Sequence, residues 1–98
     1  MTIEKTMDGN ILTIVPHGRL DSTTSDEFSD FLVENITDDM EQIVLDFKDV
    51  EFISSKGLRV IVSAHKNIEG RKLTIINANT SVMEVLRLTG LINVLDVE

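Results

Sequence analysis

Short apolar runs that resemble β-strands alternate along this chain with segments whose apolar residues recur at helical spacing. The strand-like runs are 2–7, 10–15, 42–47, 72–77 and 92–97, and the helical stripes lie within 24–37, 58–68 and 81–89. Strands that alternate with helices favour βαβ crossovers, in which the connected strands are parallel. We therefore predict an α/β fold with a mixed, mostly parallel sheet, helices packed on it, and the order β-β-α-β-α-β-α-β.

An Asp8-Gly9 pair separates the first two strand-like runs. This pair favours a tight hairpin because both of its residues tolerate a positive φ. The hairpin is expected to add one antiparallel strand at the sheet edge. Pro16 has no backbone N–H, so we expect it to end the second strand or to lie at a bulge. The third strand is apolar at 43–45, as in a strand that is covered on both faces.

Capping signals mark the expected helix ends. Thr24 with Glu27, and Ser81 with Glu84, have the spacing of a capping box. Gly70 is placed as the first residue beyond the second helix. With these boundaries, residues 1–98 form a single domain.

Composition and charge narrow the function classes. The chain has no cysteine, which excludes disulfides and thiol catalysis. Its formal charge of −8 disfavours nucleic acid and anionic membranes as partners. No apolar run approaches the roughly 20 residues that span a bilayer, and the first residues do not resemble a signal peptide. We expect a cytoplasmic domain, either a monomer or a weak dimer.

No arrangement of residues typical of an active site stands out. The sequence has no Gly-x-Ser-x-Gly elbow, no phosphate-binding P-loop and no calcium-loop spacing. His65 falls on a helical stripe and reads as a packed side chain. We therefore expect neither an enzyme nor a cofactor or metal site.

Three polar loops should meet at one edge of the sheet, because parallel strands share their carboxyl ends. They are 18–24, 54–57 and 77–81. Helix capping alone accounts for such residue types. A serine at a helix N-terminus also lies among free amide groups that favour an anion such as phosphate. Lys56 is unusual there, since a cation in the first turn opposes the helix dipole.

The segment from Asp46 to Leu58 resembles the signature of STAS domains, the bacterial anti-sigma factor antagonists and related modules. The pattern is an apolar strand ending in Asp, an aromatic residue, and a serine two positions before Gly57. Two further segments, 18–21 and 89–91, match the family in the same order along the chain.

This resemblance implies a phosphorylation switch at Ser55. A cognate anti-sigma factor, itself a serine kinase, would phosphorylate Ser55 with ATP, and a serine phosphatase of the metal-dependent class would reverse the reaction. The unphosphorylated domain would capture the anti-sigma factor and so free a sigma factor. The residues implied in partner binding are Asp21, Ser22, Thr23, Ser54, Ser55, Lys56, Gly57, Leu58 and Arg59.

Two positions depart from the family pattern. Ser54 stands where Asp is common, which makes it a competing phosphate acceptor, and Lys56 stands where a small residue is common. A second interpretation therefore stays open. STAS domains also serve, without phosphorylation, as subunits of lipid-transport ABC complexes, transporters and stressosomes.

Overall fold

The computed structural model describes residues 1–98, which form an α/β fold with six strands and three α-helices. In chain order, the elements are β1 (Thr2–Asp8), β2 (Ile11–Leu20), α1 (Ser25–Asn35), β3 (Gln42–Asp46), β4 (Val50–Ile53), α2 (Ser55–Asn67), β5 (Lys72–Ile76), α3 (Thr80–Leu88), the 3-10 turn η1 (Leu91–Asn93) and β6 (Asp96–Val97). The predicted order is confirmed, with β4 as an additional separate strand.

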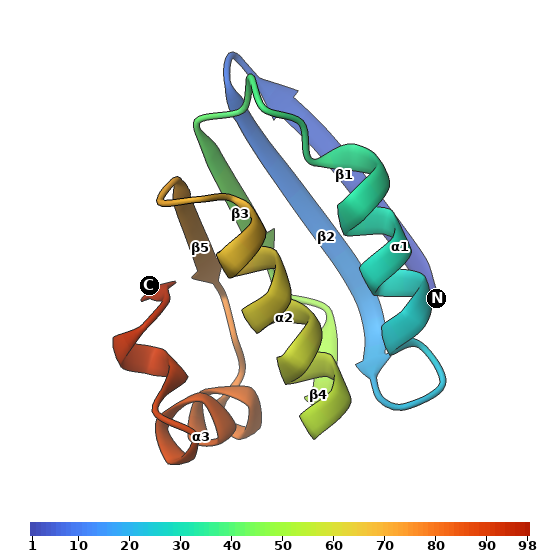
Figure 1. The fold of residues 1–98 in the computed structure, drawn as a ribbon. Helices are drawn as coiled ribbons and strands as arrows, with labels where there is room; N and C mark the ends of the chain where they lie inside the picture. Colours follow the sequence, from blue (N-terminus) through green and yellow to red (C-terminus); the bar gives the residue numbers. More distant parts are fainter.

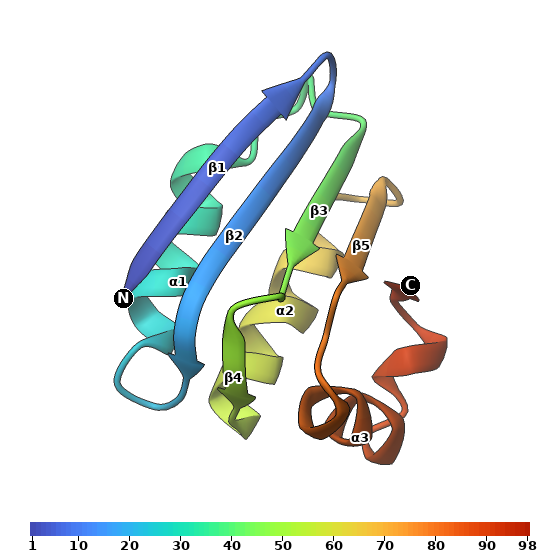
Figure 2. The ribbon, with the colours of Figure 1, turned by 180° about the vertical axis from the view of Figure 1, so that it is seen from behind.

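The sheet is mixed, with the order β1-β2-β3-β5-β6 and with β4 paired to β2 (Figure 2). Only β1 is antiparallel, and it lies at the edge as predicted. The long strand β2 pairs with β3 through residues 11–14 and with β4 through residues 18–20. It does not end at Pro16, which lies in the interval between these two ladders, where the parallel pairing needs no N–H from it.

The β1–β2 hairpin is confirmed, but its loop is shifted by one residue from the Asp-Gly pair. Asp8 pairs with Ile11, so Gly9 and Asn10 form the turn. Gly9 has a φ of +61°, whereas Asn10 does not have a positive φ. A glycine in the first of two loop positions is the pattern of a type II′ turn.

Helices α1 and α2 cover one face of the sheet and leave the other face open (Figures 1 and 2). Accordingly, Ile43 and Leu45 of β3 are buried while Val44 between them is only half-buried. The expectation that this strand is covered on both faces was therefore wrong. The connections β2-α1-β3 and β4-α2-β5 step across the sheet in the same direction, and right-handed crossovers of that kind place their helices on the same side.

The apolar faces of the helices were predicted correctly for the most part, whereas several predicted helix ends differ from those in the structure. Phe28, Leu32, Ile61 and Leu86 are buried in a single core. The residue that caps α3 is Asn79 rather than Ser81, since its side chain accepts a hydrogen bond from the N–H of Val82 at 2.8 Å.

Two further ends differ from expectation. At the C-terminus of α2, Glu69 precedes Gly70 in the left-handed region, with φ values of +51° and +85°. The run 92–97, expected to be a strand, begins within the η1 turn and continues through a turn and a bend, and only Asp96–Val97 pairs with β5.

Candidate functional site

The three polar loops do meet at the carboxyl edge of the sheet, as predicted. Leu20 is paired with Ile53, and the N–H of Ser54 donates to the carbonyl of Leu20 at 2.8 Å. The third loop is tied in by Asn79, whose side-chain amide donates to the carbonyl of Val50 at 3.2 Å. The N-termini of α1, α2 and α3 therefore lie close to this edge (Figure 1).

The two candidate acceptor serines occupy different environments. Ser54 is half-buried and is the N-cap of α2, since its Oγ accepts a hydrogen bond from the N–H of Gly57 at 3.2 Å. Ser55 is exposed as the first residue of α2, and its hydroxyl makes no hydrogen bond to the protein. The N–H groups of Ser55 and Lys56 lie in the first turn, where a helix offers no partner to them. The geometry therefore distinguishes a structural serine from an accessible one.

Gly57 is required by the chain's own packing. A Cβ at this position would lie 2.9 Å from the carbonyl oxygen of Leu20 and 3.0 Å from Cγ1 of Ile53. Gly57 is among the residues implied in partner binding, but the space beside it is filled by Leu20 of β2 and Ile53 of β4. The next residue, Leu58, is 7% exposed and belongs to the core. Both residues therefore position the site from within and offer no docking surface.

Asp21 organises the loop before α1. Its Oδ1 accepts hydrogen bonds from the hydroxyl of Thr23 at 2.6 Å and from the N–H of Thr23 at 2.9 Å. These bonds, with weaker ones from Thr24, hold the pKa of Asp21 below its usual value. The hydroxyl of Thr24 donates to the carbonyl of Arg19 instead of capping α1. The carboxylate of Asp21 is thus used to fix the loop on which Ser22 and Thr23 are exposed.

Lys56 connects the two loops. Its Nζ lies 3.2 Å from Oδ1 of Asp26 and 3.4 Å from the carbonyl oxygen of Ser22. A lysine that is unfavourable for its own helix dipole therefore pairs with an acidic residue in the first turn of α1. Arg59 is exposed one turn further along α2, on the same side as Ser55. We give the name Ser55 surface to the exposed residues Ser22, Thr23, Ser55 and Arg59 together with the half-buried Lys56.

An Arg-aromatic pair at the same edge was not anticipated. The guanidinium of Arg19 lies 4.5 Å from the ring centroid of Phe52, on the open face of the sheet. The two residues are paired across β2 and β4, and Phe52 is 37% exposed. Strand alternation could have indicated this pair. Leu20 and Ile53 point into the core, so Arg19 and Phe52, which precede them, must point to the opposite face of the sheet.

The structure shows neither a metal-binding cluster nor a spanning helix. No group of three or more His, Asp or Glu side chains is arranged to hold a metal ion. None of the helices combines the length and apolar character that crossing a bilayer requires.

The comparison with protein families decides the identity. The model of the STAS domain matches residues 2–98. The chain belongs to the STAS domain family. This membership agrees with the predicted signature around Ser55.

Solved structures share this STAS fold over nearly its whole length. An anti-sigma factor antagonist from Mycobacterium paratuberculosis superposes with a TM-score of 0.90 at 18% identity, covering 98% of this chain and 83% of that one. An anti-sigma-factor antagonist (STAS) domain protein from Planctomyces limnophilus has a TM-score of 0.82 at 17% identity, covering 97% and 87%. The Bacillus cell fate determinant SpoIIAA, in its phosphorylated form, has a TM-score of 0.74 at 16% identity, covering 99% and 91%. The fold is that of anti-sigma factor antagonists.

Proposed function

We propose that this STAS domain is an anti-sigma factor antagonist that is switched off by phosphorylation of Ser55. The unphosphorylated domain binds an anti-sigma factor that is also a serine kinase, and this binding releases a sigma factor. The domain acts by binding and not by catalysis, in the cytoplasm. The observation that carries the proposal is the contrast between Ser55, whose hydroxyl is exposed and free, and Ser54, whose hydroxyl oxygen caps α2.

The phosphorylation step needs only the exposed hydroxyl and a docked kinase. The Oγ of Ser55 attacks the γ-phosphorus of ATP, the bond to the bridging oxygen of ADP breaks, and the hydroxyl proton passes to a base of the kinase. A serine phosphatase of the metal-dependent class reverses the change by hydrolysis, in which water supplies the oxygen that leaves with the phosphate. Ser54 is disfavoured as acceptor, because modification of its oxygen removes the N-cap of α2.

The phosphate acts through local charge. It adds roughly −1.5 to −2 charges at one point of a flat surface. The positive groups nearby are the first-turn amides of α2 and the side chains of Lys56 and Arg59, of which Lys56 already faces Asp26. A partner that has docked on the Ser55 surface must desolvate or pair the new charge. Failure to do so typically costs about 2–5 kcal/mol, which is roughly 30- to 4,000-fold in affinity.

The test is intact-mass measurement after incubation with ATP and a kinase-type anti-sigma factor from the same organism. We expect the wild-type domain to gain one phosphate and Ser55→Ala to gain none. Ser54→Asn keeps an N-cap but has no hydroxyl, so it should still be phosphorylated. Ser63→Ala, which removes another exposed hydroxyl of α2, serves as the matched control.

Two outcomes would overturn this assignment. If Ser55→Ala is phosphorylated as fast as wild type, Ser55 is not the acceptor. If the domain binds its partner but no phosphate is ever transferred, the domain is a non-phosphorylated subunit, as STAS domains are in lipid-transport ABC complexes, transporters and stressosomes.

A further inference from the structure

The negative charge of this domain is concentrated in one stretch of the chain. Residues 20–47 contain nine Asp and Glu and no Lys or Arg, whereas the rest of the chain contains eight Asp and Glu and nine Lys and Arg. The stretch therefore carries a formal charge of −9, and the remainder is close to neutral. It comprises α1, the loops on either side of it and β3, and four of its nine acidic residues lie on α1, which carries no Lys or Arg.

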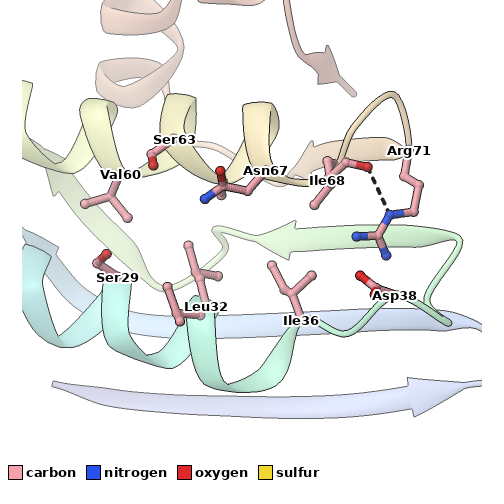
Figure 3. Close-up of a pocket in the computed structure, with 11 residues that line it drawn as sticks. Ser29, Leu32, Ile36, Asp38, Val60, Ser63, Asn67, Ile68 and Arg71 are labelled. Carbon is pink, nitrogen blue, oxygen red and sulfur yellow. Dashed lines mark hydrogen bonds between the residues drawn. The ribbon is translucent and has the colours of Figure 1, made fainter.

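A cleft runs between this acidic helix and α2 (Figure 3). Its apolar lining includes Leu32, Val60 and Ala64 of the two helices, together with Ile36 and Ile68, which directly follow α1 and α2. Its volume is about 210 Å³. This is below the ≈ 300–1,000 Å³ of typical small-molecule sites, so the cleft suits a few apolar side chains rather than a drug-sized ligand.

At each end of the cleft, contacts join the two segments of chain that lie on either side of it. At one end, the Lys56–Asp26 ion pair lies one turn before the first lining residues of each helix. At the other end, Nε of Arg71 donates to the carbonyl of Ile68 at 3.0 Å (Figure 3). Nη1 of Arg71 donates to the carbonyls of Thr37 at 2.7 Å and Met40 at 2.6 Å. The cleft is therefore already formed before anything occupies it.

The α1 side of the cleft combines an exposed apolar side chain with one acidic residue. Val33 lines the cleft and is 73% exposed. Asp38 lines the cleft beyond the end of α1, whereas the exposed Asp30 lines a separate hollow on the other side of α1. The α2 rim is polar, with Ser63 and Asn67 lining it, and the exposed cations Arg59 and Lys66 lie on the outer side of α2.

We propose that the α1–α2 cleft is a docking groove for a basic amphipathic helix of a partner protein. From Ser29 to Ile36 the α1 wall is about 10 Å long, or two helical turns, which matches apolar anchors at i, i+3 or i+4, and i+7 of a docked helix. Lysines or arginines of that helix face the α1 side of the cleft, where Asp38 lies, while its side toward Arg59 and Lys66 carries no positive charge. The groove begins further along α2 than Ser55 and is lined by residues outside the Ser55 surface. The proposal does not depend on phosphorylation.

The test is an NMR titration of the isotope-labelled full chain with a synthetic peptide of about 15 residues made of Leu, Ala and Lys, in which the Leu residues are spaced as above. A peptide of the same composition in scrambled order is the control for general attraction to an acidic protein. We expect the amide signals of Val33, Ser63 and Asn67 to shift. The ordered peptide should bind at least about 10-fold more tightly than the scrambled one.

Matched variants separate the groove from the rest of the surface. Val33→Ser should weaken binding about 5-fold, whereas Leu88→Ser, at an apolar residue that is 79% exposed on α3, should not. Asp38→Lys should weaken binding about 10-fold at low salt and less at high salt, and Glu84→Lys on α3 should have a smaller effect.

Three results would overturn the proposal. The first is equal affinity for the ordered and scrambled peptides, and the second is equal weakening by the α3 variants. The third is a shift of the groove signals with protein concentration alone, which would assign the groove to a second copy of this chain.

Discussion

Replacing Gly57 with alanine tests whether the contact between α2 and β2 positions the Ser55 surface. The added Cβ would lie 2.9 Å from the carbonyl oxygen of Leu20, which also accepts the hydrogen bond from the N–H of Ser54 at 2.8 Å. The backbone cannot move away like a flexible side chain, so either α2 or the end of β2 must shift. That shift changes the position of Ser55 relative to the Asp21 loop.

The expected magnitude is the sum of opposing effects. Alanine in place of glycine inside a helix favours the helix by about 1 kcal/mol. Overpacking a tight contact typically costs about 1–3 kcal/mol, and weakening the Ser54–Leu20 hydrogen bond costs about 1 kcal/mol more. We therefore expect Gly57→Ala to lower the free energy of unfolding by about 1–3 kcal/mol, against the direction of helix propensity.

Urea denaturation followed by circular dichroism measures this change directly. Ser63→Ala, at an exposed position of the same helix, is the control and should leave stability unchanged or raise it by about 0.5 kcal/mol. If Gly57→Ala proves as stable as wild type, the close approach of Leu20 is not what requires glycine here, and the argument fails.

Further predictions concern the cap, the loop and the cleft. Ser54→Ala should destabilise the domain by about 0.5–2 kcal/mol through loss of the α2 cap, while Ser54→Asn should restore most of it in the same urea assay. Because the folded-state pKa of Asp21 is lowered, its carboxylate adds stability above about pH 4, and this is lost as the pH falls through the folded-state value. Stability measured from pH 5 to pH 2 should thus fall less steeply for Asp21→Asn than for wild type, and equal slopes would refute this. Arg71→Ala should cost about 2–4 kcal/mol by thermal or urea unfolding, since three carbonyls lose their charged donor, and a loss near zero would show that water replaces it.

The fold could be predicted because its signals are local. Apolar alternation and helical stripes are properties of neighbouring residues, and they identified the hairpin, the three helices and the mostly parallel sheet. The shared carboxyl edge of the sheet followed from topology alone. The family signature then singled out Ser55, which the structure places in an exposed first turn.

What could not be predicted depends on contacts between distant segments. Nothing local shows that Lys56 pairs with Asp26 on another helix, or that Gly57 faces the carbonyl of Leu20. The choice of Asn79 over Ser81 as the α3 cap depends on the position of β4, whose backbone Asn79 also contacts. The helices α1 and α2 cover only one face of the sheet because of the handedness of two crossovers, and the sequence of a single strand does not indicate that handedness.

The affinity of the domain for the kinase-type anti-sigma factor, before and after phosphorylation, tests the central claim most directly. Calorimetry should show tight binding for the unmodified domain and roughly 30- to 4,000-fold weaker binding for the Ser55 phosphoprotein. Ser55→Asp should also bind more weakly, whereas Leu88→Asp, which adds charge at an exposed residue of α3, should stay within about 2-fold of wild type. Equal affinity of the phosphorylated and unmodified domains would contradict the proposed switch.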